Sequence, residues 1–371
     1  MRRRRFISGL LGAGAAMGLA PESSGATTAA AAPRAAGPHD WQSVPAPACA
    51  TAAQLLGVAA AGPDLAWAVG EEGRNGSTRG KPLALVWDGR TWTRLDLSHL
   101  GFTGGYLRSV AGSYGAAWAV GTDAAGVARL LRWDGSTWQE ADFTGRTASG
   151  TVLTSVALDA DDRVWLSGRN SDGCVLLRGD TDGWLWLPRP PSGSTATPAG
   201  LRMTRSGDVW VYDSALIARW DHEEWTELPA PAGLRPAVTG LLPVADDDIW
   251  LTGFDYGVGG PPGKPPGVTL RHWDGGAWSY APTPFTVGML TGIVDDGLGG
   301  PDRIAGWDFW DQTRSHHLRW EAGSWVSERG PVSSTAVLVN ALAAVPGAGG
   351  YWAVGMTPSS PYPPAQVYIE R

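Results

Sequence analysis

One pattern returns seven times along this chain of 371 residues. Each unit has an apolar segment that ends in Trp, an apolar residue and Gly, then a variable loop, and then Arg-Trp-Asp-Gly-x-x-Trp or a variant of it. The second unit shows the pattern most clearly, at residues 117–121 (AWAVG) and 131–138 (LRWDGSTW). Units of this length with several short strands can bury both faces of a sheet only by stacking on their neighbours. The repeats therefore predict an all-β protein, a seven-bladed β-propeller of four-stranded antiparallel blades.

The first tryptophan of each unit marks the repeat, and it recurs after 40 to 54 residues, as expected when loops vary and strands persist. The seven positions are Trp67, Trp118, Trp165, Trp210, Trp250, Ile304 and Trp352. In the second unit, the strands are predicted near residues 107–111, 116–120, 129–133 and 137–140. All 21 tryptophans lie at or beyond Trp41, and their repeated positions favour packing between blades over sugar binding.

The seventh unit has no fourth strand of its own. Tyr368 takes the place of the first tryptophan of its outer pair, and the unit breaks off at residue 371. Residues 41–45 repeat the Trp-x-x-x-Pro that ends other units, as at residues 184–188. The segment from about residue 40 to residue 45 is therefore predicted to close the last blade, and closure removes strand edges that favour aggregation.

The first 36 residues differ in kind from the rest. Four arginines at positions 2–5 precede an apolar run at residues 6–20 and an Ala-rich stretch, which is the layout of an export signal. Arg3-Arg4-Arg5-Phe6-Ile7 resembles the twin-arginine consensus, and an ordinary secretory signal is the alternative. We expect a signal peptide and linker at 1–36, a propeller domain at 37–371, and a secreted, extracellular protein that follows the twin-arginine route.

The net charge of the chain limits which kinds of molecule it can bind. The chain has 29 basic and 36 acidic side chains, and residues 1–36 hold five arginines and one glutamate. The remainder therefore carries 24 basic against 35 acidic residues, a net charge of −11. Such a surface repels nucleic-acid phosphates. We expect a monomer that binds a glycan or an extracellular protein, with no nucleic acid and no membrane insertion after the signal is removed.

The chain has two cysteines, Cys49 and Cys174. The repeats place Cys49 between the last and first blades and Cys174 in the third blade. Two residues that far apart in a propeller cannot meet the geometry of a disulfide. We expect two buried thiols.

Ligands of propellers usually bind near the central channel, on the face formed by the loops from the second to the third strand of each blade. Two of these loops combine carboxylates with exposed aromatic residues, at 254–267 and 308–317. The second also contains His316 and His317, which as neighbours on a strand would point to opposite faces and could not share one metal ion. The predicted ligand-binding residues on this loop face are Asp213, Asp255, Tyr256, Asp308, Trp310, Asp311 and His316.

Aspartates recur at comparable loop positions, at Asp123, Asp172, Asp213, Asp255 and Asp308. Several of them could surround the channel mouth, although aspartate is also a common loop residue for reasons of turn formation. Catalytic propellers that cleave glycosides need two carboxylates about 5–10 Å apart, often on the innermost strands. The predicted innermost strands contain no acid, so no catalytic residue, metal site or cofactor is predicted.

The order of apolar residue and Gly, loop, aromatic residue and Asp, turn, Trp and Leu-Pro resembles the kelch motif. The fourth unit shows it, from Trp210 through residues 220–221 to residues 225–229. The usual second Gly of the kelch motif is replaced here, for example by Glu71 or Thr122. The whole repeat region is similar to secreted actinobacterial propellers related to the central domain of galactose oxidase, and Trp-rich tectonin-type lectins are a second likeness.

The galactose oxidase resemblance implies a propeller fold. In that enzyme, copper is held by Tyr and His ligands and a Cys crosslinked to Tyr, and neither Cys49 nor Cys174 has a matching setting. The favoured interpretation is therefore an exported, non-catalytic propeller that binds a carbohydrate or a protein partner through its loop face. The alternative is an extracellular carbohydrate-active enzyme, a lyase, a hydrolase or a galactose-oxidase-like copper oxidase.

Overall fold

The computed structural model describes residues 37–143, 150–180, 183–193, 196–231, 237–256, 265–358 and 364–371. Contacts divide the chain into two units, Met1–Ala32 and Pro33–Arg371. The first unit lies outside the described residues, as do the whole predicted signal and linker at 1–36 and the Gly/Pro-rich loop at 257–264. Among the described residues there is no helix long and apolar enough to span a membrane.

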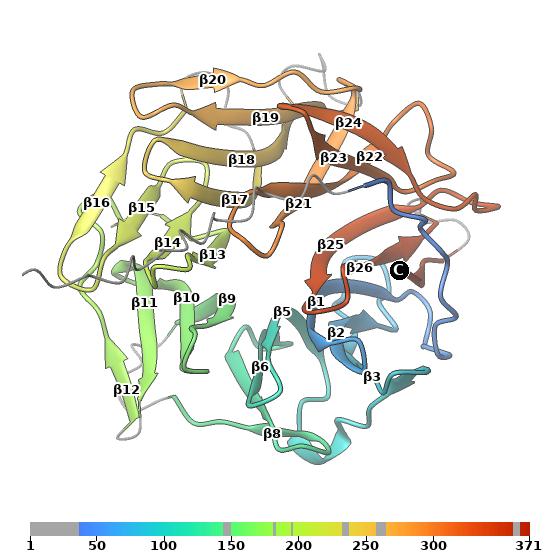
Figure 1. The fold of residues 1–371 in the computed structure, drawn as a ribbon. Helices are drawn as coiled ribbons and strands as arrows, with labels where there is room; N and C mark the ends of the chain where they lie inside the picture. The colour runs from blue at the N-terminus through green and yellow to red at the C-terminus, as the bar shows by residue number, and fades with distance from the viewer. Residues whose placement is uncertain are drawn as a thin grey trace, which may run out of the picture. The chain divides into compact units, whose positions relative to one another are not determined.

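The second unit is a ring of seven antiparallel sheets, each a blade, with the innermost strands around the central axis (Figure 1). The innermost strands are β1 (Gln54–Gly62), β5 (Gly105–Gly112), β9 (Val152–Leu158), β13 (Gly200–Met203), β17 (Ala237–Ala245), β21 (Gly288–Asp295) and β25 (Leu338–Val345). The second strands are β2 (Leu65–Glu72), β6 (Ala117–Asp123), β10 (Val164–Asn170), β14 (Val209–Tyr212), β18 (Asp248–Asp255), β22 (Pro301–Asp308) and β26 (Gly350–Thr357).

The third strands are β3 (Lys81–Trp87), β7 (Ala128–Trp133), β11 (Gly173–Asp180), β15 (Ile217–Trp220), β19 (Gly267–Trp273), β23 (His316–Glu321) and β27 (Gln366–Glu370). The outermost strands are β4 (Trp92–Arg94), β8 (Trp138–Glu140), β12 (Gly183–Trp186), β16 (Trp225–Leu228), β20 (Trp278–Tyr280) and β24 (Ser324–Arg329). A 3-10 helix, η1 (Ser98–Leu100), joins the first blade to the second. The predicted seven-bladed, all-β fold is confirmed, and the predicted strands of the second blade agree with β5 to β8.

An N-terminal segment supplies the fourth strand of the seventh blade. Ser43 pairs with Glu370 in an antiparallel bridge. The backbone N–H of Gln42 donates to the carbonyl of Arg371 at 2.7 Å, and the N–H of Arg371 donates back at 2.9 Å. Trp41 packs in the same buried cluster as Tyr368. The predicted closure of the ring is confirmed, and it pairs a strand edge that would otherwise be open.

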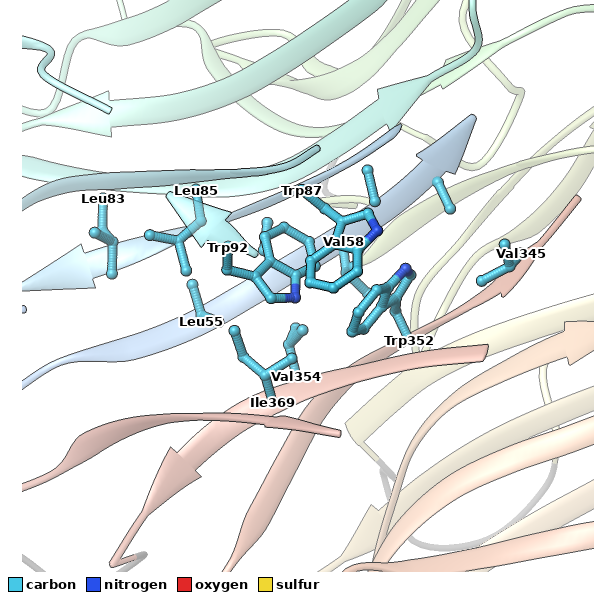
Figure 2. Packing of buried hydrophobic residues seen from close by; sticks show 13 residues of the cluster. Leu55, Val58, Leu83, Leu85, Trp87, Trp92, Val345, Trp352, Val354 and Ile369 are labelled. Atoms are coloured by element: carbon cyan, nitrogen blue, oxygen red, sulfur yellow. The ribbon is translucent and has the colours of Figure 1, made fainter. Parts of the chain in front are cut away.

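Tryptophans fill the space between neighbouring blades. Trp87 and Trp92 face each other across the β3–β4 pair, and Trp352 of β26 packs against both, with ring centroids 4.9 and 5.0 Å away. Figure 2 shows these three indoles between the first and seventh blades, with Leu55 and Val354 beside them. Edge-to-face contacts of this kind stabilise aromatic clusters beyond the area that they bury. The predicted role of the repeated tryptophans in packing is therefore confirmed.

The turn between the two outer strands explains the repeated Asp-Gly. In the second blade, Asp134 Oδ1 accepts hydrogen bonds from the backbone N–H groups of Thr137 and Ser136, both at 2.8 Å. These bonds favour the charged carboxylate and hold the pKa of Asp134 well below its usual range. Gly135 has a φ of 101°, which a side chain would strain.

The two cysteines are free thiols, Cys49 in the connection before β1 and Cys174 in β11 of the third blade. Cys174 is buried, as predicted, whereas Cys49 is only half-buried, so its expected full burial was wrong. Cys49 lies in the connection before β1, which covers it less completely than a strand position would. Burial raises the pKa of the Cys49 thiol to about 11 and that of Cys174 to about 12, because an apolar setting disfavours the thiolate.

Candidate functional site

The loop of the sixth blade gathers four of the predicted residues. β22 ends at Asp308, the loop carries Trp310 and Asp311, and β23 begins at His316. Asp308 Oδ1 accepts a hydrogen bond from the backbone N–H of Trp310 at 2.9 Å, which fixes the start of the loop. His316 Nε2 lies 3.6 Å from Asp311 Oδ2 and 3.9 Å from Asp308 Oδ2. We call Asp308, Trp310, Asp311, His316 and Arg329 the blade-six site.

His316 is a buried strand residue, so its predicted place in an exposed loop was wrong. Its side chain is 0% exposed, and its ring meets the edge of Phe285, with centroids 5.1 Å apart. The predicted loop ran to residue 317, but β23 begins two residues earlier than that prediction implied, because the β23–β24 pairing continues up to His316. Within the blade-six site, His316 is therefore a buried residue that packs beneath the loop, and Trp310 is the exposed one.

Arg329 is the member of the blade-six site that the sequence interpretation missed. It lies opposite His316 in the β23–β24 register and donates hydrogen bonds to both Asp311 and His316 Nε2. Burial and the charge of Arg329 lower the pKa of His316, and the nearby Asp308 and Asp311 oppose this shift. The hairpin could have revealed Arg329, because pairing Trp320 with Trp325 and counting four residues outward on each strand brings positions 316 and 329 together.

The two neighbouring histidines point in opposite directions, as predicted. His317 is also fully buried, but it faces the seventh blade, where its Nε2 lies 2.7 Å from Glu370 Oε1. His316 faces Phe285, which precedes β21 of its own blade. Among the residues that the structure describes, no group of three or more His, Cys, Asp or Glu side chains is placed to hold a metal ion.

Trp310 is the exposed member of the site. Its side chain is 77% exposed, and its ring meets Phe309 edge-on, with centroids 4.9 Å apart. All 21 tryptophans belong to the described residues, and the other 20 are buried or partly buried. An indole left in water forgoes the hydrophobic stabilisation that burial would give. Trp310 therefore differs from the packing tryptophans and offers a flat aromatic surface beside two carboxylates.

The other three predicted residues lie on different blades. Asp213 follows β14 and accepts hydrogen bonds from the backbone N–H groups of Ala215 and Leu216, at 2.5 and 2.8 Å, so it shapes a turn. Asp255 ends β18 and is buried. Tyr256 follows it, 63% exposed, with its ring edge-on to Phe254. The structure thus brings together Asp308, Trp310, Asp311 and His316, whereas Asp213, Asp255 and Tyr256 belong to the fourth and fifth blades.

A cavity of about 630 Å³ occupies the central channel, between the innermost strands. None of the five aspartates that could surround the channel mouth is among the described residues that line it. Its charged lining residues are instead Arg79, Arg108 and Arg202. Arg79 lies over the Tyr106 ring at 4.2 Å, and Arg202 pairs with Asp295 at 2.6 Å. The sequence interpretation missed these arginines because it searched the innermost strands for acids.

Comparisons with known proteins agree with the geometry of the ring. No protein-family model matches the chain, and no curated protein sequence matches it. A structure of YCF48 bound to D1 peptide has a TM-score of 0.60 at 12% identity, covering 90% of this chain and 96% of that one. YCF48 from Cyanidioschyzon merolae has a TM-score of 0.58 at 16% identity, covering 90% and 98%.

A catalytically inactive virginiamycin B lyase from Staphylococcus aureus with quinupristin has a TM-score of 0.56 at 11% identity, covering 89% of this chain and 98% of that one. These proteins bind different molecules on one architecture, so the likeness carries no residue-by-residue function to this chain. What the chain shares with them is its fold, a β-propeller.

Proposed function

We propose that this chain is an exported, non-catalytic propeller that binds a carbohydrate through the blade-six site on its loop face. The observation that carries the proposal is the exposure of Trp310, since the other 20 tryptophans are buried or partly buried. A sugar ring presents an apolar C–H face that an indole can cover, and hydroxyl groups at its edge that need hydrogen-bond partners. The site supplies both kinds of contact.

The polar part of the site is arranged to accept and donate at the edge of such a ring. Asp311 is 32% exposed at its side chain, so its carboxylate can accept hydroxyl hydrogen bonds. Arg329 is 42% exposed and holds Asp311 in place. A flat aromatic surface with a few fixed polar groups is typical of small-molecule sites. His316 and Asp308 are both buried, so they hold the exposed groups in position and do not contact the solvent themselves.

A protein partner is the alternative ligand, and the similar YCF48 structure, which is bound to D1 peptide, supports it. An exposed aromatic residue with an arginine and an aspartate beside it also fits the contacts that dominate protein interfaces. The kelch-like and galactose-oxidase-like relationship, an actinobacterial source and export by the twin-arginine route remain predictions from the sequence. The carbohydrate-active enzyme remains the alternative function.

The test is a glycan-array screen of the chain from residue 37, followed by calorimetric titration of the glycans that bind. Trp310→Ala should abolish binding and leave the melting temperature unchanged, because an exposed ring contributes little to packing. Tyr114→Ala is the matched control, since Tyr114 is 64% exposed but lies in the β5–β6 turn at the opposite rim. Equal glycan affinity of the wild type and Trp310→Ala would refute the site.

Two further outcomes separate the alternatives. Binding of no glycan, together with capture of an extracellular protein that is lost in Trp310→Ala, would favour the protein partner. Cleaved or oxidised sugar among the titrated glycans would favour the enzyme. Asp308→Ala is a poor probe, because Asp308 is buried and holds the backbone of the loop, so its loss would disturb folding as well as binding.

A further inference from the structure

The innermost strands share an irregularity that points side chains into the central cavity. In six of the seven blades, the pairing register between the first and second strands skips a residue in the first half of the first strand, which is a β-bulge. The skipped residues are Leu56, Arg108, Thr154, Thr239, Thr291 and Asn340, and all six line the cavity. Bulges re-aim side chains and are common next to binding sites. We call these six residues the bulge ring.

Two polar members of the bulge ring, Thr239 and Asn340, hold neighbouring blades together. Thr239 Oγ1 donates to the carbonyl of Leu290 on the next blade at 2.7 Å. Asn340 Nδ2 donates to the carbonyl of Leu55 at 2.8 Å, which joins the seventh blade to the first. These side chains have a structural partner, so they are fixed in place and not free to take up a ligand by themselves.

Arg108 is different. Its guanidinium group has no ion-pair partner among the described residues, and its side chain is exposed to the cavity. Arg79 and Arg202 line the same cavity, and each does have a carboxylate partner, Glu71 at 3.6 Å and Asp295 at 2.6 Å. The two carboxylates pair with Arg79 and Arg202 and not with Arg108. Arg108 therefore contributes a positive charge to the channel that no carboxylate of the described residues pairs with.

The surroundings increase the effect of that charge. The described residues that line the cavity include three arginines and no aspartate or glutamate. The whole chain, in contrast, has a net charge of −7. Burial raises the pKa of Tyr212, which also lines the cavity, and the charges of Arg202 and Arg108 both oppose this rise. Walls of low dielectric constant focus the field of such a cluster on the space between them.

We propose that the central cavity is a second binding site, which takes a small organic oxyanion, a molecule that carries a carboxylate, sulfate or phosphate group, on Arg108. A guanidinium group donates two parallel hydrogen bonds to such a group, and it does so best where water is partly excluded. A volume of about 630 Å³ fits an organic molecule of sugar or small-acid size rather than a bare ion. This site goes beyond the proposed function, since none of the blade-six residues lines the cavity.

The test is calorimetric titration at low ionic strength with three sugars of equal ring size: D-glucuronate, glucose 6-phosphate and neutral D-glucose. We expect the two anions to bind and glucose to bind at least tenfold more weakly in the cavity, with an affinity for the anions that falls as salt is added. The carboxylate and phosphate arms show which oxyanion the site prefers. If neither anion binds more tightly than glucose, the proposal is wrong.

Variants assign the binding to Arg108. Arg108→Gln should weaken anion binding at least tenfold, and Arg108→Lys should restore part of it, because lysine keeps the charge and loses the fork. Arg205→Gln is the matched control, since Arg205 is exposed in the β13–β14 turn outside the cavity lining. Unchanged anion affinity in a folded Arg108→Gln protein would overturn the proposal.

The two proposed sites fail independently. Trp310→Ala should leave anion binding unchanged, and Arg108→Gln should leave glycan binding at the blade-six site unchanged. Arg108 gives up no ion pair when it is replaced, so loss of folding is not expected, and far-ultraviolet circular dichroism checks this. If Arg108→Gln nevertheless unfolds, Arg108→Lys alone decides: affinity for glucuronate equal to that of the wild type would contradict the bidentate geometry.

Discussion

Trp41 stacks face to face on His317, with ring centroids 3.8 Å apart and ring planes inclined by 10°. Trp41 belongs to the N-terminal segment that closes the seventh blade, and His317 belongs to β23 of the sixth. The indole N–H of Trp41 also donates to Glu328 Oε2 at 3.0 Å. One side chain of the closing segment therefore contacts two strands of the neighbouring blade as well as its own.

A substitution of Trp41 tests how much this contact stabilises the ring. Trp41→Ala should lower the free energy of unfolding by about 3–5 kcal/mol, the range for truncating a buried Trp. Trp41→Phe should cost less, because a phenyl ring can still stack on His317 but cannot donate to Glu328. Chemical denaturation of the three proteins measures both values, and a Trp41→Ala protein as stable as the wild type would show that the stack contributes nothing.

Two truncations test the closure itself. Removal of residues 1–47 should lower the melting temperature sharply, because it exposes the backbone edge of β27. Removal of residues 1–36 should leave it unchanged. The cut should not extend to Gly37, because its carbonyl accepts a hydrogen bond from the buried Arg303 at 2.7 Å. Differential scanning calorimetry of the two proteins makes the comparison, and equal melting temperatures would contradict the seven-bladed ring.

The buried His316 makes stability depend on pH. Its pKa is lowered from 6.5 in the folded protein, mainly by burial, so the unfolded chain binds a proton more readily. The stability that the neutral His316 contributes is fully present above the pKa of histidine in the unfolded chain. It is lost as the pH falls below that value towards the lower pKa of the folded protein. Between pH 7 and about pH 5, the free energy of unfolding should fall, and His316→Gln should reduce that slope.

The control for this pH effect is His222→Asn, since His222 is an exposed turn residue with a φ of 80° that asparagine also tolerates. Its slope should match that of the wild type. His39 has a pKa shift in the same direction, again mainly from burial, so the slope of His316→Gln should be reduced and not abolished. A slope in His316→Gln equal to that of the wild type would argue against a buried neutral histidine.

The two thiols should be slow to react at neutral pH. Burial raises the pKa of Cys49 to about 11 and that of Cys174 to about 12, and the thiolate is the reactive form. A thiol reagent should therefore label both cysteines in denaturant and neither at a comparable rate in the native protein. Of the two, the half-buried Cys49 should react first. Rapid native labelling of Cys174 would mean that its blade opens readily.

Export is tested at the N-terminus. Changing Arg3 and Arg4 together to Lys should retain the protein inside a host that uses the twin-arginine route, because that route requires the arginine pair. Arg2→Lys is the matched control and should leave secretion unchanged, since Arg2 lies outside the pair. Fractionation of the culture followed by immunoblotting measures the result, and normal secretion of the double variant would favour the ordinary secretory signal.

The repeated tryptophans and the Asp-Gly turns predicted the fold well, because each unit has the same local chemistry and the ring follows from repetition. The Trp-x-x-x-Pro at residues 41–45 likewise predicted the closing strand. The site was harder to predict. The burial of His316 depends on Phe285, and its partner Arg329 comes from another strand, so neither follows from the order of residues in the loop.

The channel was the least predictable part of the molecule. Arg108 lies in an ordinary run of strand residues, and only the skipped pairing between Leu107 and Ser109 turns it towards the axis. A bulge of this kind leaves no local trace when neither residue is glycine. The aspartates, in contrast, were predicted to bind a ligand from their loop positions. In the structure, Asp213 instead accepts hydrogen bonds from backbone N–H groups of its own turn.

At most strand positions, a residue must both pair with the neighbouring strand and place its side chain correctly. The bulges of the innermost strands separate these two requirements. A skipped residue such as Arg108 or Leu56 takes no part in the pairing of its blade, so its side chain can change while the ladder stays intact. Related chains could therefore exchange the chemistry of the channel, from cationic to apolar or acidic, through single substitutions at those bulge positions whose side chains make no bond to a neighbouring blade. The same property makes the bulge ring a practical place to install new binding specificity in this propeller.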